Sequence, residues 1–468
     1  MRQVDALSRV RLLHWNEIAG GATFAAVSHV MKKLISLLCL LAGPVPAPAA
    51  DHLLIIGDSL SKEYDVEGAG IGIDVFPPPS PYPKNWCELL DSRRGAFFDY
   101  GDFDVHTDIR AAGHDYNWSV PGSYAADWRE DYLPNPPGAL EDQLAQSQVK
   151  RAVVWLGGND VRESYGDLYN GLTSPAVWAA QTYIDIAFVL DWIVARRQPD
   201  VQVVLVNVAH LGATISKNRD FPYDAVKTGR VTAALDDLNA QLAALARGRG
   251  AGLADIYRLT KELVTRDRMS IGGWVVTKKS SSDADTDAMF LGDGFHPNMP
   301  VQAVFAQTIL DTFNAHGGTD IPRLTNREIV NSCLDENPDV SFAAWTASYE
   351  LPAAERSAAS DPDRDGVPNI VEFGLDLDPS RADVHLLPQP RLVVQGTQHF
   401  LTLTWQPRDP SNTTRCEITP QQSGNLLAWT NVPAASIVSG SPNTRTVSVP
   451  VMPGQRVWLR LQVRQLGL

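Results

Sequence analysis

Four short runs made mostly of apolar residues lie along the first part of the chain, at 52–56, 152–156, 202–208 and 251–256. Runs of this length are typical of strands that are buried on both faces of a parallel sheet. Three longer stretches are predicted helices, and two of them carry apolar residues three and four positions apart: 175–197, 225–247 and the closing helix 300–316. Strands that alternate with helices predict an α/β domain over 51–320, with helices on both faces of its sheet.

The pattern changes in the last part of the chain. Short runs rich in β-branched and apolar residues alternate there with Pro, Gly, Ser and Asn, at 391–395, 399–405, 414–419, 445–451 and 456–463. This alternation predicts a small all-β sandwich over 385–468. Residues 321–384 are predicted to form a linker between the two domains.

The N-terminal region has the pattern of an export signal. Residues 31–50 read MKKLISLLCLLAGPVPAPAA, with two lysines, a short apolar run and then small residues. This pattern predicts a signal peptide that is cleaved near residue 50, because the apolar run is too short to span a bilayer. Met31 is then the expected true start, and residues 1–30 would be an upstream extension that is not translated. The alternative to the signal peptide is a buried apolar helix with a basic start. We therefore expect a bacterial protein that is secreted, periplasmic or on the cell surface.

Composition narrows the classes of partner. The net charge is −14, which argues against broad binding to nucleic acid or to an anionic membrane. We expect no membrane span in the mature chain, because no apolar stretch outside the N-terminus is long enough. The four cysteines form no CxxC pair, and Cys39 leaves with the signal peptide. A disulfide between Cys87 and Cys333 stays open, as does the oligomeric state.

The first candidate for chemistry is Gly57-Asp-Ser59-Leu60. Ser59 comes just after the first predicted strand, and open α/β sheets place their ligands at the carboxyl ends of their strands. The alternative is an ordinary cap between a strand and a helix. The chain has no GxSxG nucleophile elbow, which argues against the α/β-hydrolase arrangement.

The second candidate is Asp293-Gly-Phe-His296-Pro-Asn298. A serine hydroxyl is a weak nucleophile until a base takes its proton, and neutral imidazole is the usual base. A carboxylate three residues before His296 can accept its Nδ1–H and hold the required tautomer. The alternative is that His296 caps the following helix.

The third candidate is a set of hydrogen-bond donors. Gly157-Gly-Asn159-Asp160 follows a predicted strand, and Asn117-Trp-Ser-Val-Pro-Gly122 lies earlier in the chain. Acyl transfer builds negative charge on a former carbonyl oxygen, and each donor aimed at that oxygen contributes about 3–4 kcal/mol. The Asn159 amide, the Gly122 N–H and the Ser59 N–H are suitable donors. Alone, the GGND segment would be interpreted as a tight turn.

These motifs occur together in the order typical of one superfamily. The GDSL, NxSxxG, GGND and DGxHPN segments resemble those of SGNH/GDSL hydrolases, and they span Gly57 to Asn298. The resemblance implies a flavodoxin-like three-layer α/β/α fold. It also implies that Ser59 is the nucleophile, His296 the base and Asp293 its partner, with an oxyanion hole of Ser59, Gly122 and Asn159. The chemistry then needs no cofactor.

A separate motif lies in the linker. Residues 361–372, DPDRDGVPNIVE, match the pattern D-x-[DN]-x-[DN]-G-x5-E of a calcium loop. Its expected ligands are Asp361, Asp363, Asp365, the Val367 carbonyl, Asn369 and Glu372. The segment resembles the dockerin-like or thrombospondin type 3-like linkers of secreted bacterial proteins. We expect a structural Ca²⁺ here, and the alternative is a solvated acidic linker.

Together these observations predict a secreted serine esterase. The expected substrate is an acylated carbohydrate such as an O-acetylated polysaccharide, because the chain has an export signal, an added β domain and aromatic residues near the site. Those aromatic residues are Tyr116, Trp118, Tyr124 and Trp128, for which ordinary packing is the alternative. Two rival functions stay open: a lipase-like or broad carboxylesterase, and a non-catalytic protein that binds glycans through 385–468.

Overall fold

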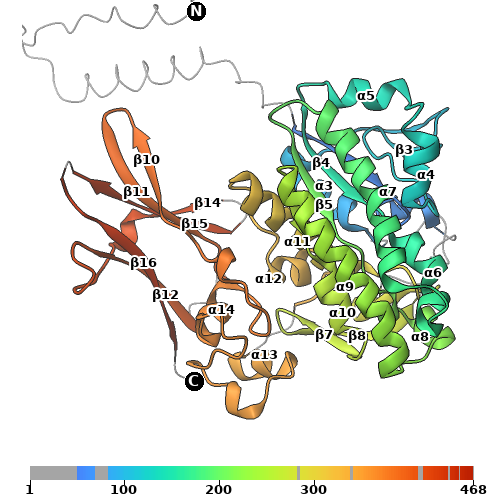
Figure 1. The fold of residues 1–468 in the computed structure, drawn as a ribbon. Helices are drawn as coiled ribbons and strands as arrows, with labels where there is room; N and C mark the ends of the chain where they lie inside the picture. Colours follow the sequence, from blue (N-terminus) through green and yellow to red (C-terminus); the bar gives the residue numbers. More distant parts are fainter. Residues whose placement is uncertain are drawn as a thin grey trace, which may run out of the picture. The chain divides into compact units, whose positions relative to one another are not determined.

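The computed structural model describes residues 50–466, apart from 69–82, 282–284, 338–340, 409–414, 441–442 and 453 (Figure 1). The chain divides into two compact units, 1–49 and 50–468, and the description that follows concerns the second. The predicted upstream segment, and the predicted signal peptide up to Ala49, lie outside the described residues.

A parallel sheet forms the centre of the first domain. Its strands are β1 (His52–Gly57), β4 (Val149–Trp155), β5 (Gln202–Val206) and β6 (Gly252–Ala254), in the order β1-β4-β5-β6. On the free edge of β1, Asn117 forms a parallel bridge with Ile55, and the Val120 N–H donates to the Gly57 carbonyl at 3.0 Å. This later segment therefore lies on the far side of β1 from β4, as in the strand order of flavodoxin-like folds.

Alternate residues of the strands serve two separate cores. Leu53 and Ile55 pack with α3 (Trp86–Phe98) and α11 (Met299–Gly317). Leu54 and Ile56 pack with α7 (Pro175–Arg196) and α9 (Ala225–Gly248). This follows from the period of two in a strand, which sends successive side chains to opposite faces. The predicted three-layer α/β/α fold is confirmed, with helices on both faces of the sheet (Figure 1).

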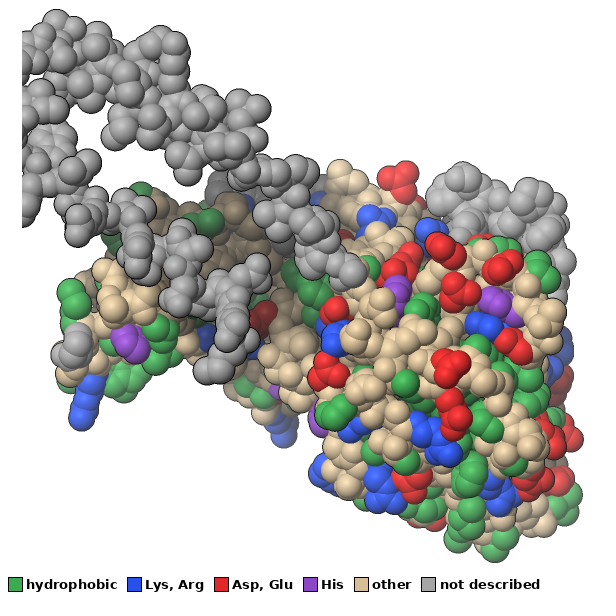
Figure 2. Space-filling model, turned by 90° about the horizontal axis from the view of Figure 1, so that it is seen from above, with side chains coloured by type: hydrophobic (Ala, Val, Ile, Leu, Met, Phe, Trp, Pro, Cys, Tyr) green, Lys and Arg blue, Asp and Glu red, His purple; other side chains and the backbone are tan. Residues whose placement is uncertain are grey.

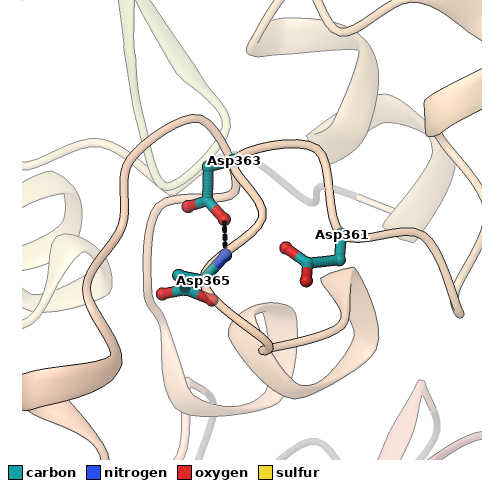
Figure 3. A group of neighbouring side chains, drawn as sticks. All are labelled: Asp361, Asp363 and Asp365. Atoms are coloured by element: carbon teal, nitrogen blue, oxygen red, sulfur yellow. Dashed lines mark hydrogen bonds between the residues drawn. The ribbon is translucent and has the colours of Figure 1, made fainter.

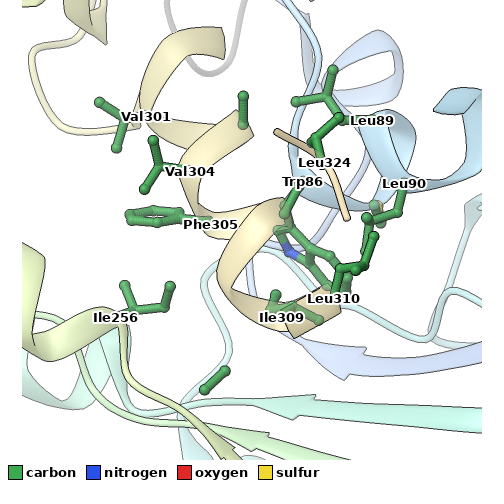
Figure 4. Close-up of a cluster of buried hydrophobic side chains, with 14 of the residues drawn as sticks. Trp86, Leu89, Leu90, Ile256, Val301, Val304, Phe305, Ile309, Leu310 and Leu324 are labelled. Carbon is green, nitrogen blue, oxygen red and sulfur yellow. The ribbon is translucent and has the colours of Figure 1, made fainter. Parts of the chain in front are cut away.

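Figure 4 shows the first of these cores. Trp86 and Leu90 of α3 lie beside Leu310 of α11, and Phe305 points from α11 toward Ile256. Trp86, Leu90 and Leu310 are completely buried. This packing fixes α11 against the sheet, and the histidine loop that precedes α11 is fixed with it.

Shorter elements complete the first domain. They are α2 (Tyr64–Glu67), β2 (Phe103–Val105), β3 (Ala112–His114), α4 (Ala125–Asp127), η2 (Trp128–Tyr132), α5 (Gly138–Leu144), α6 (Gly158–Asn170), η3 (Leu211–Ala213), α8 (Ile215–Asp220), α10 (Ile256–Glu262), β7 (Arg268–Ile271), β8 (Trp274–Ser281) and β9 (Ala288–Leu291). The sheet β7-β8-β9 was not predicted. Its first turn is Gly272-Gly273, and both glycines have positive φ, as a tight hairpin requires.

The predicted linker contains short helices: α12 (Asn326–Glu328), η4 (Ile329–Cys333), α13 (Phe342–Ser348), η5 (Ala353–Glu355), α14 (Asn369–Leu375) and η6 (Val384–Leu386). Two antiparallel sheets follow. One is β10-β11-β15-β14 and the other is β13-β12-β16. The strands are β10 (Arg391–Gln395), β11 (Gln398–Trp405), β12 (Cys416–Ser423), β13 (Thr430–Asn431), β14 (Ile437–Gly440), β15 (Thr444–Val451) and β16 (Trp458–Gln465), with η7 (Ala434–Ser436) between β13 and β14.

A small core joins these two sheets. Trp405 and Val447 come from the first sheet and Leu459 from the second, and all three belong to one buried cluster. The predicted C-terminal antiparallel β architecture is therefore confirmed. All five predicted runs are strands, whereas β13 and β14 were not predicted.

The sequence predicted no membrane span in the mature chain and left a disulfide between Cys87 and Cys333 open. Among the described residues, one helix, α7, is long and apolar enough to cross a membrane by length and composition alone. Buried core helices pass the same test, and Ile186, Val189 and Leu190 of α7 are completely buried in the core. The disulfide considered between Cys87 and Cys333 is not formed, because both thiols are free.

The surface charges are mixed. On the face that Figure 2 shows, acidic and basic side chains of the described residues lie intermixed rather than gathered by sign.

Candidate active site

Ser59 lies in a tight turn at the carboxyl end of β1. The N–H groups of Ser61 and Lys62 both donate to the Asp58 carbonyl at 3.1 Å, and the Asp58 side chain accepts the Leu60 N–H at 2.9 Å. This turn reverses the chain immediately after the strand. It leaves Ser59 9% exposed at the edge of the sheet where α/β folds bind ligands.

Ser59, His296 and Asp293 form a continuous chain of hydrogen bonds. His296 Nε2 lies 2.9 Å from Ser59 Oγ, and His296 Nδ1 lies 2.5 Å from Asp293 Oδ2. This places Nδ1–H toward the carboxylate and leaves Nε2 free to accept the serine proton. The three predicted catalytic residues are thus brought together in the geometry of a nucleophile, a base and an orienting acid.

The Asp293 carboxylate is stabilised in its ionised form. Burial raises its pKa, but hydrogen bonding and charge interaction with His296, and the N–H groups of Phe295 and His296, outweigh burial and lower the pKa below its usual value. Asp293 Oδ1 accepts those two N–H groups at 2.8 and 3.0 Å. The carboxylate is therefore both charged and fixed in orientation at neutral pH.

The loop that carries His296 is itself held by the backbone. The Leu291 N–H donates to the His296 carbonyl at 2.9 Å, and the Asn298 N–H donates to the Met289 carbonyl at 2.8 Å. Asn298 caps α11, so His296 is not the helix cap that the sequence left as an alternative.

A buried polar network connects this loop to the segment after Ser59. Tyr64 Oη donates to the Pro297 carbonyl at 2.7 Å, and Gln302 Nε2 donates to Tyr64 Oη at 2.6 Å. Gln302 Oε1 accepts the Trp86 N–H at 3.2 Å. Tyr64 and Gln302 therefore set the distance between the two segments that carry Ser59 and His296. Neither residue lies in a motif, so neither could be predicted from the sequence.

Gly122 lies in a turn directly after the segment that pairs with β1. The Val120 N–H donates to the Gly57 carbonyl at 3.0 Å, and the Ser123 N–H donates to the Val120 carbonyl at 3.1 Å. Gly122 has a φ of +79°, which favours glycine, although a Cβ would meet no atom within 4 Å there. The backbone conformation, rather than lack of space, is what calls for glycine at this donor.

Asn159 lies in the first turn of α6 and binds the Gly122 loop. Asn159 Nδ2 donates to the Ser123 carbonyl at 3.0 Å, and the neighbouring Asp160 Oδ2 accepts the Ala125 N–H at 3.1 Å. The amide has a second N–H that these bonds do not use. Asn159 can thus hold the Gly122 loop and still donate to an oxyanion.

Asn159→Ala is expected to lower kcat by about 10²–10³-fold with a smaller change in KM, because it removes one oxyanion donor. The measurement is steady-state hydrolysis of p-nitrophenyl acetate. Asn170→Ala, on the exposed end of the same helix, is the matched control and should behave as wild type. Equal kcat values for wild type and Asn159→Ala would exclude Asn159 from the oxyanion hole.

Asp58, the residue before the nucleophile, is a buried acid that sequence analysis did not single out. Burial raises its pKa to about 6, against the lowering effects of the Leu60 N–H and His296. A Cβ on Gly158 would lie 2.9 Å from Asp58 Oδ2, so the glycine of the GGND segment leaves room for this carboxyl group.

Asp58→Asn is expected to flatten the pH dependence of stability. Because the pKa of Asp58 is about 6 in the folded chain and about 3.8 for an exposed aspartate, its protonated form favours folding below pH 4, and that contribution disappears as pH rises through 6. The wild-type free energy of unfolding should therefore fall by ~2 kcal/mol more than that of Asp58→Asn between pH 4 and 7. Urea unfolding at both pH values measures the difference, and parallel curves would contradict it.

Two of the four aromatic residues considered as sugar platforms are core residues. Trp118 and Trp128 are completely buried, and their indole N–H groups donate to Gln143 Oε1 and Ser123 Oγ at 2.7 and 3.2 Å. Tyr116 is half-buried and donates to Gln146. Tyr124, at 36% exposed, is the one of the four with an exposed ring. Ordinary packing therefore accounts for the tryptophans.

The predicted calcium loop has the expected backbone. Figure 3 shows Asp361, Asp363 and Asp365 gathered around one point, and one ligand atom from each lies within 4.8 Å of the others. Asp361 accepts the Gly366 N–H at 2.9 Å, and Asp363 accepts the Asp365 N–H at 3.1 Å. Gly366 has a φ of +93°, as the sharp turn at the sixth position requires.

The other predicted ligands lie nearby in the chain. Glu372 is in α14 and completely buried, and both of its carboxylate oxygens lack a hydrogen-bond partner among the described residues. Asn369 opens α14, and its amide nitrogen donates to the carbonyls of Glu355 and Ser357 at 2.8 and 2.9 Å. Its side-chain oxygen is buried without a partner in the described part of the chain. Oxygen donors of this kind fit a Ca²⁺ ion.

No protein-family model matches the sequence, and no curated protein is a significant match. Solved structures that resemble the chain include phospholipase A1 from Streptomyces albidoflavus and an extracellular lipase from Streptomyces rimosus. Each is 16% identical with a TM-score of 0.32, and each match covers 56% of this chain and 99% of the other. A candidate SGNH hydrolase from Slackia heliotrinireducens is 14% identical with a TM-score of 0.30 and the same coverage, 56% and 99%. The sequence identities and TM-scores of these matches are low. The assignment of a function therefore rests on the geometry of the site and not on these similar structures.

Proposed function

We propose that the chain is a serine esterase of the SGNH/GDSL type that hydrolyses carboxylic esters. The observation that carries this proposal is the hydrogen-bonded chain from Ser59 Oγ through His296 to Asp293. Ser59 is 237 residues from His296 in the sequence, and nothing in the fold alone requires it to align with the His296–Asp293 pair at the carboxyl edge of the sheet. Their alignment next to the GGND segment supports acyl transfer.

In the proposed mechanism, Ser59 Oγ attacks the ester carbonyl while His296 Nε2 takes the hydroxyl proton. The carbonyl oxygen gains the negative charge and binds the N–H groups of Ser59 and Gly122 and the Asn159 amide. His296 then gives its proton to the alcohol oxygen, and the C–O bond breaks to leave an acyl-serine. Water repeats the sequence through the same histidine and releases the acid. Asp293 stabilises the imidazolium in both halves.

We propose an acylated carbohydrate as the substrate, in an exported protein. The support lies at the wall of the site as well as in the predicted signal peptide. Phe295 packs beside His296, with ring centroids 5.2 Å apart, and the Arg162 guanidinium lies 5.0 Å from the Phe295 ring centre. Arg162 is exposed, so a cationic side chain lies one ring away from His296. A charged side chain near the base supports a polar substrate such as a sugar ester over a long acyl chain.

The test compares acetate release from an O-acetylated polysaccharide with fatty-acid release from a triglyceride emulsion, using the chain from residue 51. Release of acetate with little activity on the emulsion is expected. Strong activity on the emulsion without acetate release would favour the lipase-like alternative. No activity on any ester, together with retention on a polysaccharide column, would overturn the esterase proposal in favour of a glycan-binding protein.

A further inference from the structure

The carboxylate oxygens around the loop 361–372 are unevenly satisfied. One oxygen of Asp361, one of Asp363 and both of Asp365 accept backbone N–H groups. The other oxygens of Asp361 and Asp363, and both oxygens of Glu372, are buried and have no partner among the described residues. Buried carboxylate oxygens without partners are costly, which makes this set a candidate for a cation.

A fifth such oxygen comes from outside the loop. Asp383 is 6% exposed, and its Oδ1 is buried without a partner in the described part of the chain, while its Oδ2 accepts the Asp378 N–H at 3.0 Å. The Asp383 N–H donates to Asp365 Oδ2 at 2.8 Å, which places this residue directly against the calcium loop. The pattern of a twelve-residue loop does not include a ligand at this position.

Asp383 lies against the calcium loop by two backbone bonds. The N–H groups of Asp383 and Val384 both donate to Asp365 Oδ2, at 2.8 and 2.9 Å. The nearby cations are committed elsewhere: Arg323 pairs with Asp311 at 2.7 Å, and Arg381 lies near Glu262 and Asp378 at 3.4 and 3.7 Å. The protein itself therefore supplies little counter-charge to these acids.

We propose that Asp383 is a ligand of a Ca²⁺ site, together with Asp361, Asp363, Asp365, the Val367 carbonyl and a bidentate Glu372, and that the ion fastens the segment after α14 to the loop. These residues supply seven oxygen donors if one Asp365 oxygen, which already accepts a backbone N–H group, also binds the ion. Seven oxygen donors suit Ca²⁺ rather than Mg²⁺, which prefers six in strict octahedral order.

Binding of Ca²⁺ by Asp383 would have a structural consequence, because the segment 376–383 lies where the first domain and the β domain meet. The buried Asp376 accepts the Arg327 N–H at 2.5 Å and pairs with Arg408 of the β domain at 3.0 Å. Arg408 also donates to the Gly272 carbonyl of the first domain. Several residues of 376–386 line a cavity of about 590 Å³, whose other lining residues come mostly from 243–259 and 304–316, with Met269, Ser270, Arg323 and Asn326. Ca²⁺ bound by Asp383 would thus stabilise the contact between the two domains.

The test is calcium titration of the full chain from residue 51 by calorimetry, together with thermal unfolding in EDTA and in excess Ca²⁺. Asp383→Asn keeps the acceptor for the Asp378 N–H and removes the charge. It is expected to weaken Ca²⁺ binding at least ~10-fold and to abolish most of the increase in Tm that Ca²⁺ gives the wild type. In EDTA its Tm should equal or exceed that of the wild type, because it removes the charge of a buried carboxylate whose Oδ1 has no partner among the described residues.

Two further variants make the result decisive. Asp378→Asn is the matched control. Asp378 is also an acid, five residues before Asp383, but its Oδ1 already accepts hydrogen bonds from the N–H and hydroxyl groups of Ser380. This control should change the affinity by less than ~3-fold, whereas Glu372→Gln should lose binding. If Asp383→Asn binds Ca²⁺ as the wild type does while Glu372→Gln does not, Asp383 is no ligand. If Asp383→Asn lowers the Tm equally with and without Ca²⁺, its role is structural only, and absence of Ca²⁺ binding by the wild type would overturn the site.

Discussion

Ser59→Ala is expected to lower kcat for p-nitrophenyl acetate by at least ~10⁴-fold, to the level that oxyanion donors and binding alone sustain. The reason is that no other hydroxyl occupies the position 2.9 Å from His296 Nε2 in the described structure. The fold should not change, because the side chain contributes no buried apolar surface. Thermal unfolding of the same preparation checks this.

Ser61→Ala is the matched control for Ser59→Ala. Ser61 lies two residues away and is completely buried, but its hydroxyl accepts the Trp86 indole N–H and does not face His296. It is expected to lose some stability and to retain kcat within a few-fold. Residual activity above about 1% in a folded Ser59→Ala protein would show that another group carries the attack.

Asp293→Asn is the second large effect, with an expected loss of about 10³–10⁴-fold in kcat. The new amide can keep its oxygen toward the Phe295 and His296 N–H groups, so its NH₂ faces His296 Nδ1. Nδ1 must then accept, and the proton moves to Nε2, which can no longer take the proton of Ser59. The charge that stabilises the imidazolium is also lost.

The measurement for Asp293→Asn is a pH–rate profile against wild type, with unfolding curves to show that the loop is intact. Asp220→Asn, an exposed acid at the end of α8, is the control and should leave the profile unchanged. A kcat for Asp293→Asn within ~3-fold of the wild type would mean that the hydrogen bond at 2.5 Å has no part in the reaction.

The parallel sheet could be predicted because each of its strands has a local pattern of apolar residues. Residues 53–56 and 152–156 are apolar throughout, as strands between two helical layers must be, and each run ends where a motif begins. The order of the motifs then placed Ser59 and Asn159 at the same edge of the sheet. The structure adds the distances, and those depend on packing far along the chain.

Other features could not be found in this way. The contact of Tyr64 with Gln302 joins two residues outside any motif, and the contact of Asp383 with Asp365 adds a residue from outside the calcium loop; only the folded chain brings these residues together. The hairpin at Gly272-Gly273 did carry a local signal, since two glycines between apolar runs are typical of a tight turn. For Trp118 and Trp128 the sequence left sugar stacking and ordinary packing open, and the structure places both in the core, where aromatic residues are usually found.

The most direct test of the central claim is covalent labelling with an organophosphonate ester, followed by mass spectrometry of the intact chain and its peptides. The account predicts one adduct per chain, on the peptide that contains Ser59, formed in step with loss of esterase activity and absent from Ser59→Ala. An adduct on another residue, or full inhibition without a label on Ser59, would contradict the assignment of Ser59 as the nucleophile.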